Sequence, residues 1–159
     1  MRKVSYPFLP KSNSFLIPGQ FWAIPLKNNK FACGRVIEVS KEDKRGFLAG
    51  LMDWVGDEPP TSESIAGKKT LMQGDAHIKT IHETGFEGMV LGYRSLEEDD
   101  IVPDMFKSES VFSETCKLMK GYEKIRPINK EEWEKYSTFS TWGYLVIKNL
   151  AEDFFCKTQ

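Results

Sequence analysis

The stretch FWAIPLKNNKFACGRVIEV, residues 21–39, decides how this chain begins to fold. Apolar residues alternate on both sides of KNNK, and asparagines tolerate the left-handed backbone that a tight turn requires. The pattern predicts a β-hairpin with strands over 20–26 and 31–39. Pro25 has no N–H to donate to a neighbouring strand, so its strand is predicted to be an edge there or to carry a bulge.

The second strand of this hairpin carries one arginine in an apolar row. Strict alternation places on one face Phe31, Cys33, Arg35, Ile37 and Val39. Either a bulge at Gly34 turns Arg35 outward, or its guanidinium stays at the sheet and is paired. We expect a partly buried Arg35 that donates to a carboxylate or to backbone carbonyls of a neighbouring segment. Its expected role is structural, and a place in a binding interface is the alternative.

Further strands are expected in the middle of the chain. The apolar run 46–55 favours a strand because it is short and has glycines at its margins. Segments 71–86 and 87–96 are typical of strands joined by a glycine-containing turn. The segment 116–128 predicts a short hairpin or a single strand. Before these, Thr61 is expected to cap one or two short helical turns.

The C-terminal part of the chain changes to helical spacing. Asn129 and Glu132 form a capping-box pattern, and apolar residues over 145–155 predict an amphipathic helix that closes the core. Strands followed by helices indicate an α+β fold. We expect a twisted, mostly antiparallel β-sheet, or a partly open small barrel, packed with a few α-helices of which the main one is C-terminal. Residues 1–159 are expected to form one domain that starts with an irregular segment over 1–18.

Composition indicates a globular protein and argues against several classes. The chain has 159 residues, enough to bury a real core, and 40% of them are hydrophobic. Its three cysteines are far apart in sequence, which argues against a disulfide framework and for a reducing cytoplasm. We expect no signal peptide, because prolines and polar residues interrupt the N-terminal segment. We also expect no membrane span, because no apolar run is long enough.

Charge is distributed unevenly along the chain, although the net charge is only −1. Residues 51–110 hold 13 acidic and 5 basic side chains, whereas residues 1–50 hold 3 acidic and 9 basic ones. The densest acidic run, LEEDDIVPD, contains Glu97, Glu98, Asp99, Asp100 and Asp104. Such a run is either a solvated loop or a patch that steers a basic partner. The acidic middle of the chain argues against nucleic acid as a direct ligand.

Residues in and around the hairpin form a signature, which consists of Gly19, Phe21, Ile24, Pro25, Leu26, Gly34, Arg35 and Val36. This signature resembles the opening of the immunity protein 26 family of bacterial polymorphic toxin systems. The DEPPT loop, a strand ending at Gly92 and the WGY that leads into the last helix are compatible with the resemblance, which covers roughly residues 15–155. The chain differs from the family pattern in lacking a glycine in the turn and in having Cys33 where an aromatic residue is common.

The resemblance implies a cytoplasmic protein that binds and neutralises a cognate protein toxin, without catalysis and without a cofactor. Its candidate toxin-binding residues are the acidic run named above and Trp133. All four tryptophans are candidate anchors, with core packing as the alternative for each. Trp133 lies among charged residues and is the one expected to be partly exposed. The residues expected to be structural, with binding as an alternative role, are Trp22, Pro25, Gly34 and Arg35.

Catalytic and metal-binding patterns are sparse in this sequence. The two histidines, His77 and His82, have an odd spacing that places them on opposite faces of a strand, so we expect no metal site. Nothing in the sequence near Cys33 activates it as a nucleophile. One alternative function is a phosphotriester hydrolase, an activity described for one member of the resembled family. The other is a β-barrel module that binds a peptide or small ligand through Trp22 and Arg35.

Overall fold

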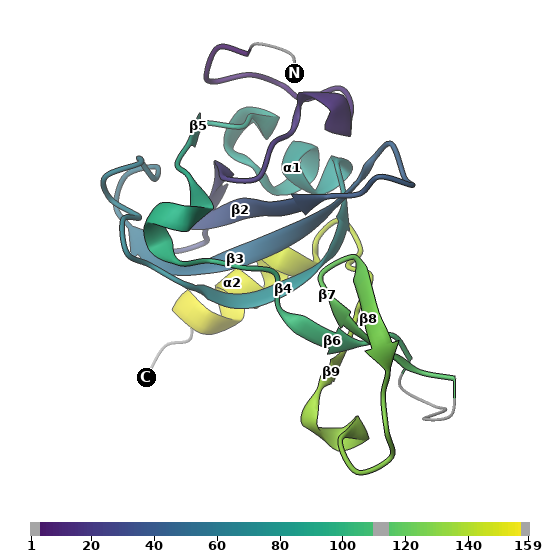
Figure 1. Cartoon of the computed structure of the whole chain (residues 1–159). Helices are drawn as coiled ribbons and strands as arrows, with labels where there is room; N and C mark the ends of the chain where they lie inside the picture. Colours follow the sequence, from purple (N-terminus) through teal and green to yellow (C-terminus); the bar gives the residue numbers. More distant parts are fainter. Residues whose placement is uncertain (1–3, 110–114, 157–159) are drawn as a thin grey trace.

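The computed structural model of the chain describes residues 4–109 and 115–156. These residues form two β-sheets, one of five strands in the order β4-β3-β2-β1-β5 and one of four in the order β8-β7-β6-β9 (Figure 1). The strands of the larger sheet are β1 (Gln20–Pro25), β2 (Phe31–Val39), β3 (Gly46–Gly56), β4 (Thr70–His77) and β5 (Gly92–Tyr93). Those of the smaller sheet are β6 (Met105–Lys107), β7 (Lys117–Lys120), β8 (Glu123–Pro127) and β9 (Ser137–Thr138).

Two α-helices pack on one face of the larger sheet, and short 3-10 turns connect the other elements. The helices are α1 (Lys79–Thr84) and α2 (Val146–Phe155), and the turns are η1 (Asn13–Phe15), η2 (Phe86–Gly88), η3 (Leu96–Asp99) and η4 (Trp133–Lys135). Ile147 and Ala151 of α2 are fully buried and share a core with Ile81 of α1. The predicted C-terminal helix is therefore confirmed, and its apolar side closes the core as expected.

The predicted hairpin forms as β1 and β2, which pair antiparallel from Phe21 opposite Arg35 to Pro25 opposite Phe31. Asn29 in the connecting turn has a φ of 66°, so an asparagine does adopt the left-handed backbone. On its other side β1 pairs with β5 at Gln20 and Phe21 alone. Pro25 therefore lies where that side of β1 has no partner strand, which confirms the expectation drawn from its missing N–H.

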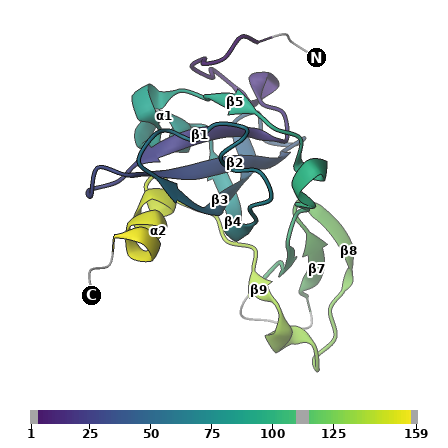
Figure 2. The same ribbon diagram turned by 90° about the vertical axis from the view of Figure 1, so that its left-hand side faces the viewer.

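The larger sheet is covered on both faces (Figures 1 and 2). On one face, Trp22 and Phe47 of the strands pack against Ile81 of α1 and Ala151 of α2. The opposite face packs strand residues such as Cys33 and Leu48 against residues of the smaller sheet, among them Phe106 and Met119. Because the second cluster draws side chains from both sheets, the smaller sheet is docked on the larger one by a shared apolar core. The described residues form no closed barrel, and the α+β prediction is confirmed.

The expected strand over 71–86 is wrong in its second half. β4 ends at His77, and α1 follows from Lys79 to Thr84. Ile81 is fully buried in the core beside the helix α2, and this tertiary packing stabilises a helical turn that local alternation did not indicate. The expected strand over 87–96 shrinks to β5, with η2 ending before it at Gly88 and η3 beginning after it at Leu96.

Both capping predictions are correct in their hydrogen bonds. Thr61 Oγ1 accepts from Ser64 N at 3.1 Å, and Ile65 N donates to Thr61 O at 3.2 Å, which closes one short helical turn as expected. Asn129 and Glu132 bond reciprocally, at 3.1 Å and 3.0 Å, but open only the short turn η4. The segment 116–128 forms the hairpin β7–β8, one of the two forms expected for it. Within the described residues, no helix is long and apolar enough to cross a membrane.

Candidate functional site

Arg35 is buried inside the protein with every part of its guanidinium in contact with an acceptor. The residue has 0% relative exposure, and it stays on the face of β2 that also holds Cys33 and Ile37. Its Nε donates to Gly19 O at 3.2 Å and its Nη2 to Arg94 O at 2.5 Å. Both Nη atoms also donate to Asp99 Oδ2, at 3.4 Å and 3.3 Å. The predicted pairing to a carboxylate and to backbone carbonyls is confirmed, and burial is complete rather than partial.

Asp99 is the centre of this arrangement because four groups converge on it. Besides Arg35, its carboxylate accepts from Arg94 Nε at 3.0 Å and from Gly67 N at 2.8 Å. Lys69 Nζ donates to the Asp99 backbone carbonyl. We call Arg35, Asp99, Arg94 and Gly67 the Arg35 clamp. It ties η3 and the turn before β4 to the middle of the larger sheet, so these two loops are held in one position.

The ionisation of the clamp follows from the balance between burial and pairing. Burial raises the pKa of Asp99, but the hydrogen bonds from Arg94 and Gly67 and the charges of Arg94 and Arg35 lower the pKa further, so it lies below its ordinary value. Burial lowers the pKa of Arg35, and the charge of Asp99 and the hydrogen bond to it oppose that change. Burial also raises the pKa of Cys33. Cys33 is therefore a protonated thiol, which agrees with the expectation that nothing activates it.

The acidic run is divided between the surface and the interior. Glu97, Glu98, Asp100 and Asp104 are exposed, whereas Asp99 is only 2% exposed. The expectation that Asp99 belongs to a solvated patch is corrected, because its carboxylate is turned inward to pair with Arg35 and Arg94. The other four carboxylates lie on the segment that joins the two sheets. We call Glu97, Glu98, Asp100 and Asp104 the acidic loop.

The tryptophans fall into two groups. Trp22 and Trp142 are core residues with 0% and 6% exposure. Trp54 and Trp133 are partly exposed, as the charged neighbours of Trp133 led us to expect. Lys107 Nζ lies 3.8 Å above the Trp133 ring, a cation–π contact at the outer end of the smaller sheet. Trp22 thus packs in the core, whereas Trp133 is partly exposed and packs against the small cluster of Cys116, Leu118 and Ile128.

The remaining hairpin residues hold the scaffold together. Gly34 lies against the Trp22 ring so closely that an added Cβ would be 2.3 Å from Trp22 Cζ2. Pro25 O accepts from Lys148 Nζ at 2.6 Å, which attaches the end of β1 to α2. Both contacts are internal, so they support the structural role expected for Trp22, Pro25 and Gly34.

The two histidines are engaged separately. His77 Nδ1 accepts from Lys79 N at 3.0 Å, and His82 Nε2 is 2.6 Å from Pro10 O. Within the described residues, no group of three or more His, Cys, Asp or Glu side chains is placed to hold a metal ion. Nothing in this arrangement offers the ligand set that an activated water would need in a phosphotriesterase.

We therefore expect the melting temperature of the purified protein to be the same with and without EDTA. The physical reason is that, among the described residues, no three potential ligands lie together around either histidine, so we expect no metal ion to contribute to folding. Thermal unfolding followed by circular dichroism checks this, with metal content measured on the same sample. A lowered melting temperature in EDTA, together with stoichiometric zinc, would contradict it.

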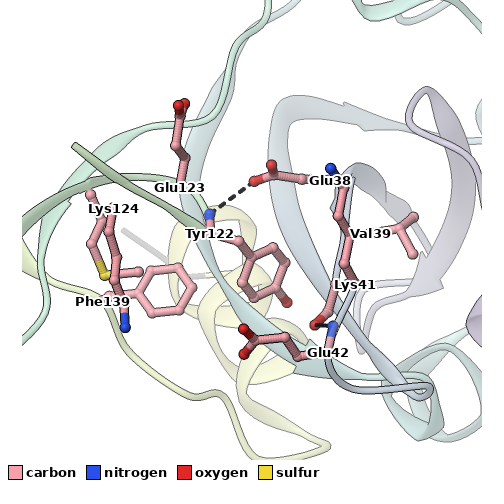
Figure 3. Close-up of a pocket in the computed structure, with 10 residues that line it drawn as sticks. Glu38, Val39, Lys41, Glu42, Tyr122, Glu123, Lys124 and Phe139 are labelled. Atoms are coloured by element: carbon pink, nitrogen blue, oxygen red, sulfur yellow. Dashed lines mark hydrogen bonds between the residues drawn. The ribbon is translucent and has the colours of Figure 1, made fainter.

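A cleft of about 770 Å³ opens where the two sheets meet (Figure 3). Its walls come from the end of β2 and the turn after it (38–42), from the β7–β8 hairpin and from Phe139. Tyr122 lies at its centre, and its OH donates to Asp75 Oδ1 at 2.5 Å while its N–H donates to Glu38 Oε1 at 2.9 Å. Burial and the hydrogen bond to Asp75 raise the pKa of Tyr122, so its hydroxyl is neutral.

This cleft escaped the sequence analysis. Its walls come from three segments that are distant in sequence, with 84 positions between Glu38 and Tyr122. None of these segments carries a sequence motif. Gly121 is required at this position, because its φ is 57° and an added Cβ would lie 2.2 Å from Glu38 Oε1. Such a glycine in a hairpin turn does not by itself indicate which segment lies against it.

Comparison with protein families gives a match to the model described as immunity protein 26, over residues 17–117. The matched span begins before β1 and ends at the first residue of β7, so it includes the whole larger sheet and the Arg35 clamp. No curated protein and no solved structure matches the chain.

Proposed function

Because the chain belongs to the immunity protein 26 family, we propose that it binds a cognate protein toxin and neutralises it. The toxin would belong to a bacterial polymorphic toxin system, and neutralisation would take place in the cytoplasm of the cell that makes both proteins. The free thiols of Cys33, Cys116 and Cys156 fit that reducing compartment. Inhibition by binding requires no catalytic residue and no cofactor of the immunity protein.

The observation that carries this proposal is the family match over 17–117. Features of the described residues support it further. An inhibitor keeps its affinity when its binding surface is already ordered before the partner arrives. The Arg35 clamp supplies such order, because it fixes η3, and with it the start of the acidic loop, to the sheet.

The surface that we propose for the toxin is the acidic loop, with Trp133 as an anchor. The side chains of Glu97 and Asp100 have no ion pair with any described residue, and Glu98 has only an exposed contact of 4.0 Å to Arg94. Uncompensated carboxylates on one loop attract a basic partner and raise its rate of association. Partly exposed tryptophans are common among the residues that dominate binding energy.

Co-expression with the product of the adjacent upstream gene tests the proposed function directly. We expect the toxin to arrest growth when expressed alone, and the two proteins to purify as a complex when expressed together. Hydrolysis of a chromogenic phosphotriester is expected to be absent. A freely growing strain without complex formation, or phosphotriester hydrolysis at a rate proportional to this protein, would contradict the proposal.

Charge reversal tests the proposed surface. We expect Glu97→Lys combined with Glu98→Lys to slow association with the toxin by about tenfold at low ionic strength, because steering depends on charge. The effect should shrink as salt is added. The control is Glu58→Lys with Glu83→Lys, two exposed residues that do not belong to the acidic loop and that give the same net charge. Equal association rates for the two double variants, measured by stopped flow, would remove the acidic loop from the interface.

A further inference from the structure

The cleft between the sheets has a wall of two aromatic rings that is set before any partner arrives. The rings of Tyr122 and Phe139 are 5.5 Å apart and inclined at 72°, and Phe139 is in turn 5.2 Å from Phe106. Tyr122 is held at both ends, by its OH on Asp75 and its N–H on Glu38. Both rings are partly exposed, so part of their surface is open to the cleft.

Carboxylates flank these rings without a cationic partner. Glu38 is half-buried, its Oε1 accepts from Tyr122 N, and its Oε2 has no hydrogen bond to any described residue. Glu42 makes no side-chain hydrogen bond or ion pair with the described part of the chain. In the view of Figure 3 the Tyr122 ring lies between the Glu38 and Glu42 carboxylates, while Glu123 points away from the rings.

The cleft also has two lysines on its rim, Lys41 and Lys124, both exposed. Their long stems can turn into solvent, whereas the Glu38 carboxylate is held in place by Tyr122 N. The charge that an incoming side chain meets at the rings is therefore negative. An acidic side chain would be repelled by Glu38 and Glu42, and a purely apolar one would leave the half-buried Glu38 without a cationic partner.

We propose that this cleft is a socket for an arginine side chain of the toxin. A planar guanidinium stacks on tyrosine and phenylalanine faces and donates to carboxylates through two parallel N–H groups. Tyr122 and Phe139 supply the faces, and Glu38 and Glu42 supply the acceptors. A volume of about 770 Å³ is ample for this side chain together with the backbone that carries it.

In this socket, residues from both sheets would contact the same arginine side chain. Glu38 belongs to β2 of the larger sheet, and Tyr122 follows β7 of the smaller one. Gly121 N donates to Asp104 O at 2.9 Å, which places the socket next to the last residue of the acidic loop. The loop would attract the basic partner and the socket would hold one of its arginines. The identity of the occupant as a toxin residue rests on the proposed function, whereas the affinity of the socket for arginine does not.

Titration of the labelled full chain with N-acetyl-arginine amide tests the socket alone. We expect amide chemical shifts of Glu42, Tyr122 and Phe139 to move in the ¹⁵N–¹H spectrum. N-acetyl-citrulline amide, which has the same shape and no charge, should leave them in place. Glu38→Gln keeps an acceptor for Tyr122 N and should weaken arginine binding by about tenfold, as should Glu42→Gln. Glu58→Gln, at an exposed site outside the cleft, should bind like the parent.

Shifts elsewhere in the protein, equal shifts with citrulline, or equal binding by Glu42→Gln and the parent would overturn the socket. If Glu38→Gln loses the dispersed spectrum of a folded protein, Glu42→Gln alone tests whether the carboxylates of the cleft bind arginine. With the toxin in hand, Glu42→Gln should raise the Kd by about tenfold and Glu58→Gln should not. A toxin complex that tolerates Glu42→Gln refutes the socket and leaves the proposed function intact. Failure to form any toxin complex refutes the proposed function. In that case the titration with N-acetyl-arginine amide still shows whether the cleft binds arginine.

Discussion

Arg35→Ala is expected to lower the free energy of unfolding by about 3–5 kcal/mol, the cost of removing one partner of a buried ion pair. The substitution leaves the Asp99 carboxylate buried beside an empty volume and removes the Arg35 donor from the carbonyls of Gly19 and Arg94, of which Gly19 O keeps the Arg94 N–H. Chemical denaturation followed by tryptophan fluorescence measures the loss, because Trp22 and Trp142 are buried in the parent.

Arg126→Ala is the matched control for this measurement. Arg126 also donates two hydrogen bonds to a carboxylate, that of Glu132, but its side chain is 46% exposed. Exposed ion pairs contribute little, so this control should lose much less stability than Arg35→Ala. In a double-mutant cycle, Asp99→Asn and Arg35→Ala should cost less together than the sum of their separate costs. If Arg35→Ala unfolds like the parent and yet loses toxin binding, Arg35 belongs to the interface.

Gly34→Ala is expected to lower the free energy of unfolding by about 3 kcal/mol, at the upper end of the usual cost of overpacking. The added Cβ would lie 2.3 Å from Trp22 Cζ2 and 2.4 Å from Trp22 Cε2. Trp22 is fully buried and packs edge-on against Phe47 at 5.8 Å, so its ring has no room to withdraw. The hairpin must bend away from the core or the ring must leave its position.

Gly143→Ala is the control for a glycine with space around it, because its added Cβ would meet nothing nearer than Val146 Cγ2 at 3.9 Å. It should change stability by less than about 0.5 kcal/mol. The clash itself is tested in a Trp22→Phe background, where the smaller ring should reduce the cost of Gly34→Ala. A Gly34→Ala variant as stable as Gly143→Ala would show that the glycine is not required by the Trp22 ring.

Local patterns were sufficient for elements whose stability depends on near neighbours in sequence. The hairpin β1–β2 follows from alternation around an asparagine turn, and α2 follows from helical spacing of apolar residues. The capping box of Asn129 and Glu132 also forms, although the packing around it allows only a short turn. Where a distant contact decides, as for Ile81 in α1, local alternation predicted a strand and was wrong.

For the candidate site, the sequence alone determined that Arg35 stands in an apolar row. It left two arrangements open, a bulge at Gly34 that turns Arg35 outward or a guanidinium that stays at the sheet and is paired. It also determined that the chain has an acidic middle and a signature typical of its family. Only the tertiary structure decided that the partner of Arg35 is Asp99, 64 residues further along the chain, which removes Asp99 from the acidic surface. The same holds for the cleft, whose Glu38 and Tyr122 meet across 84 residues. Alternation and spacing report on which side chains share a face, whereas the meeting of distant segments depends on how whole faces pack, and that is set by the complete fold.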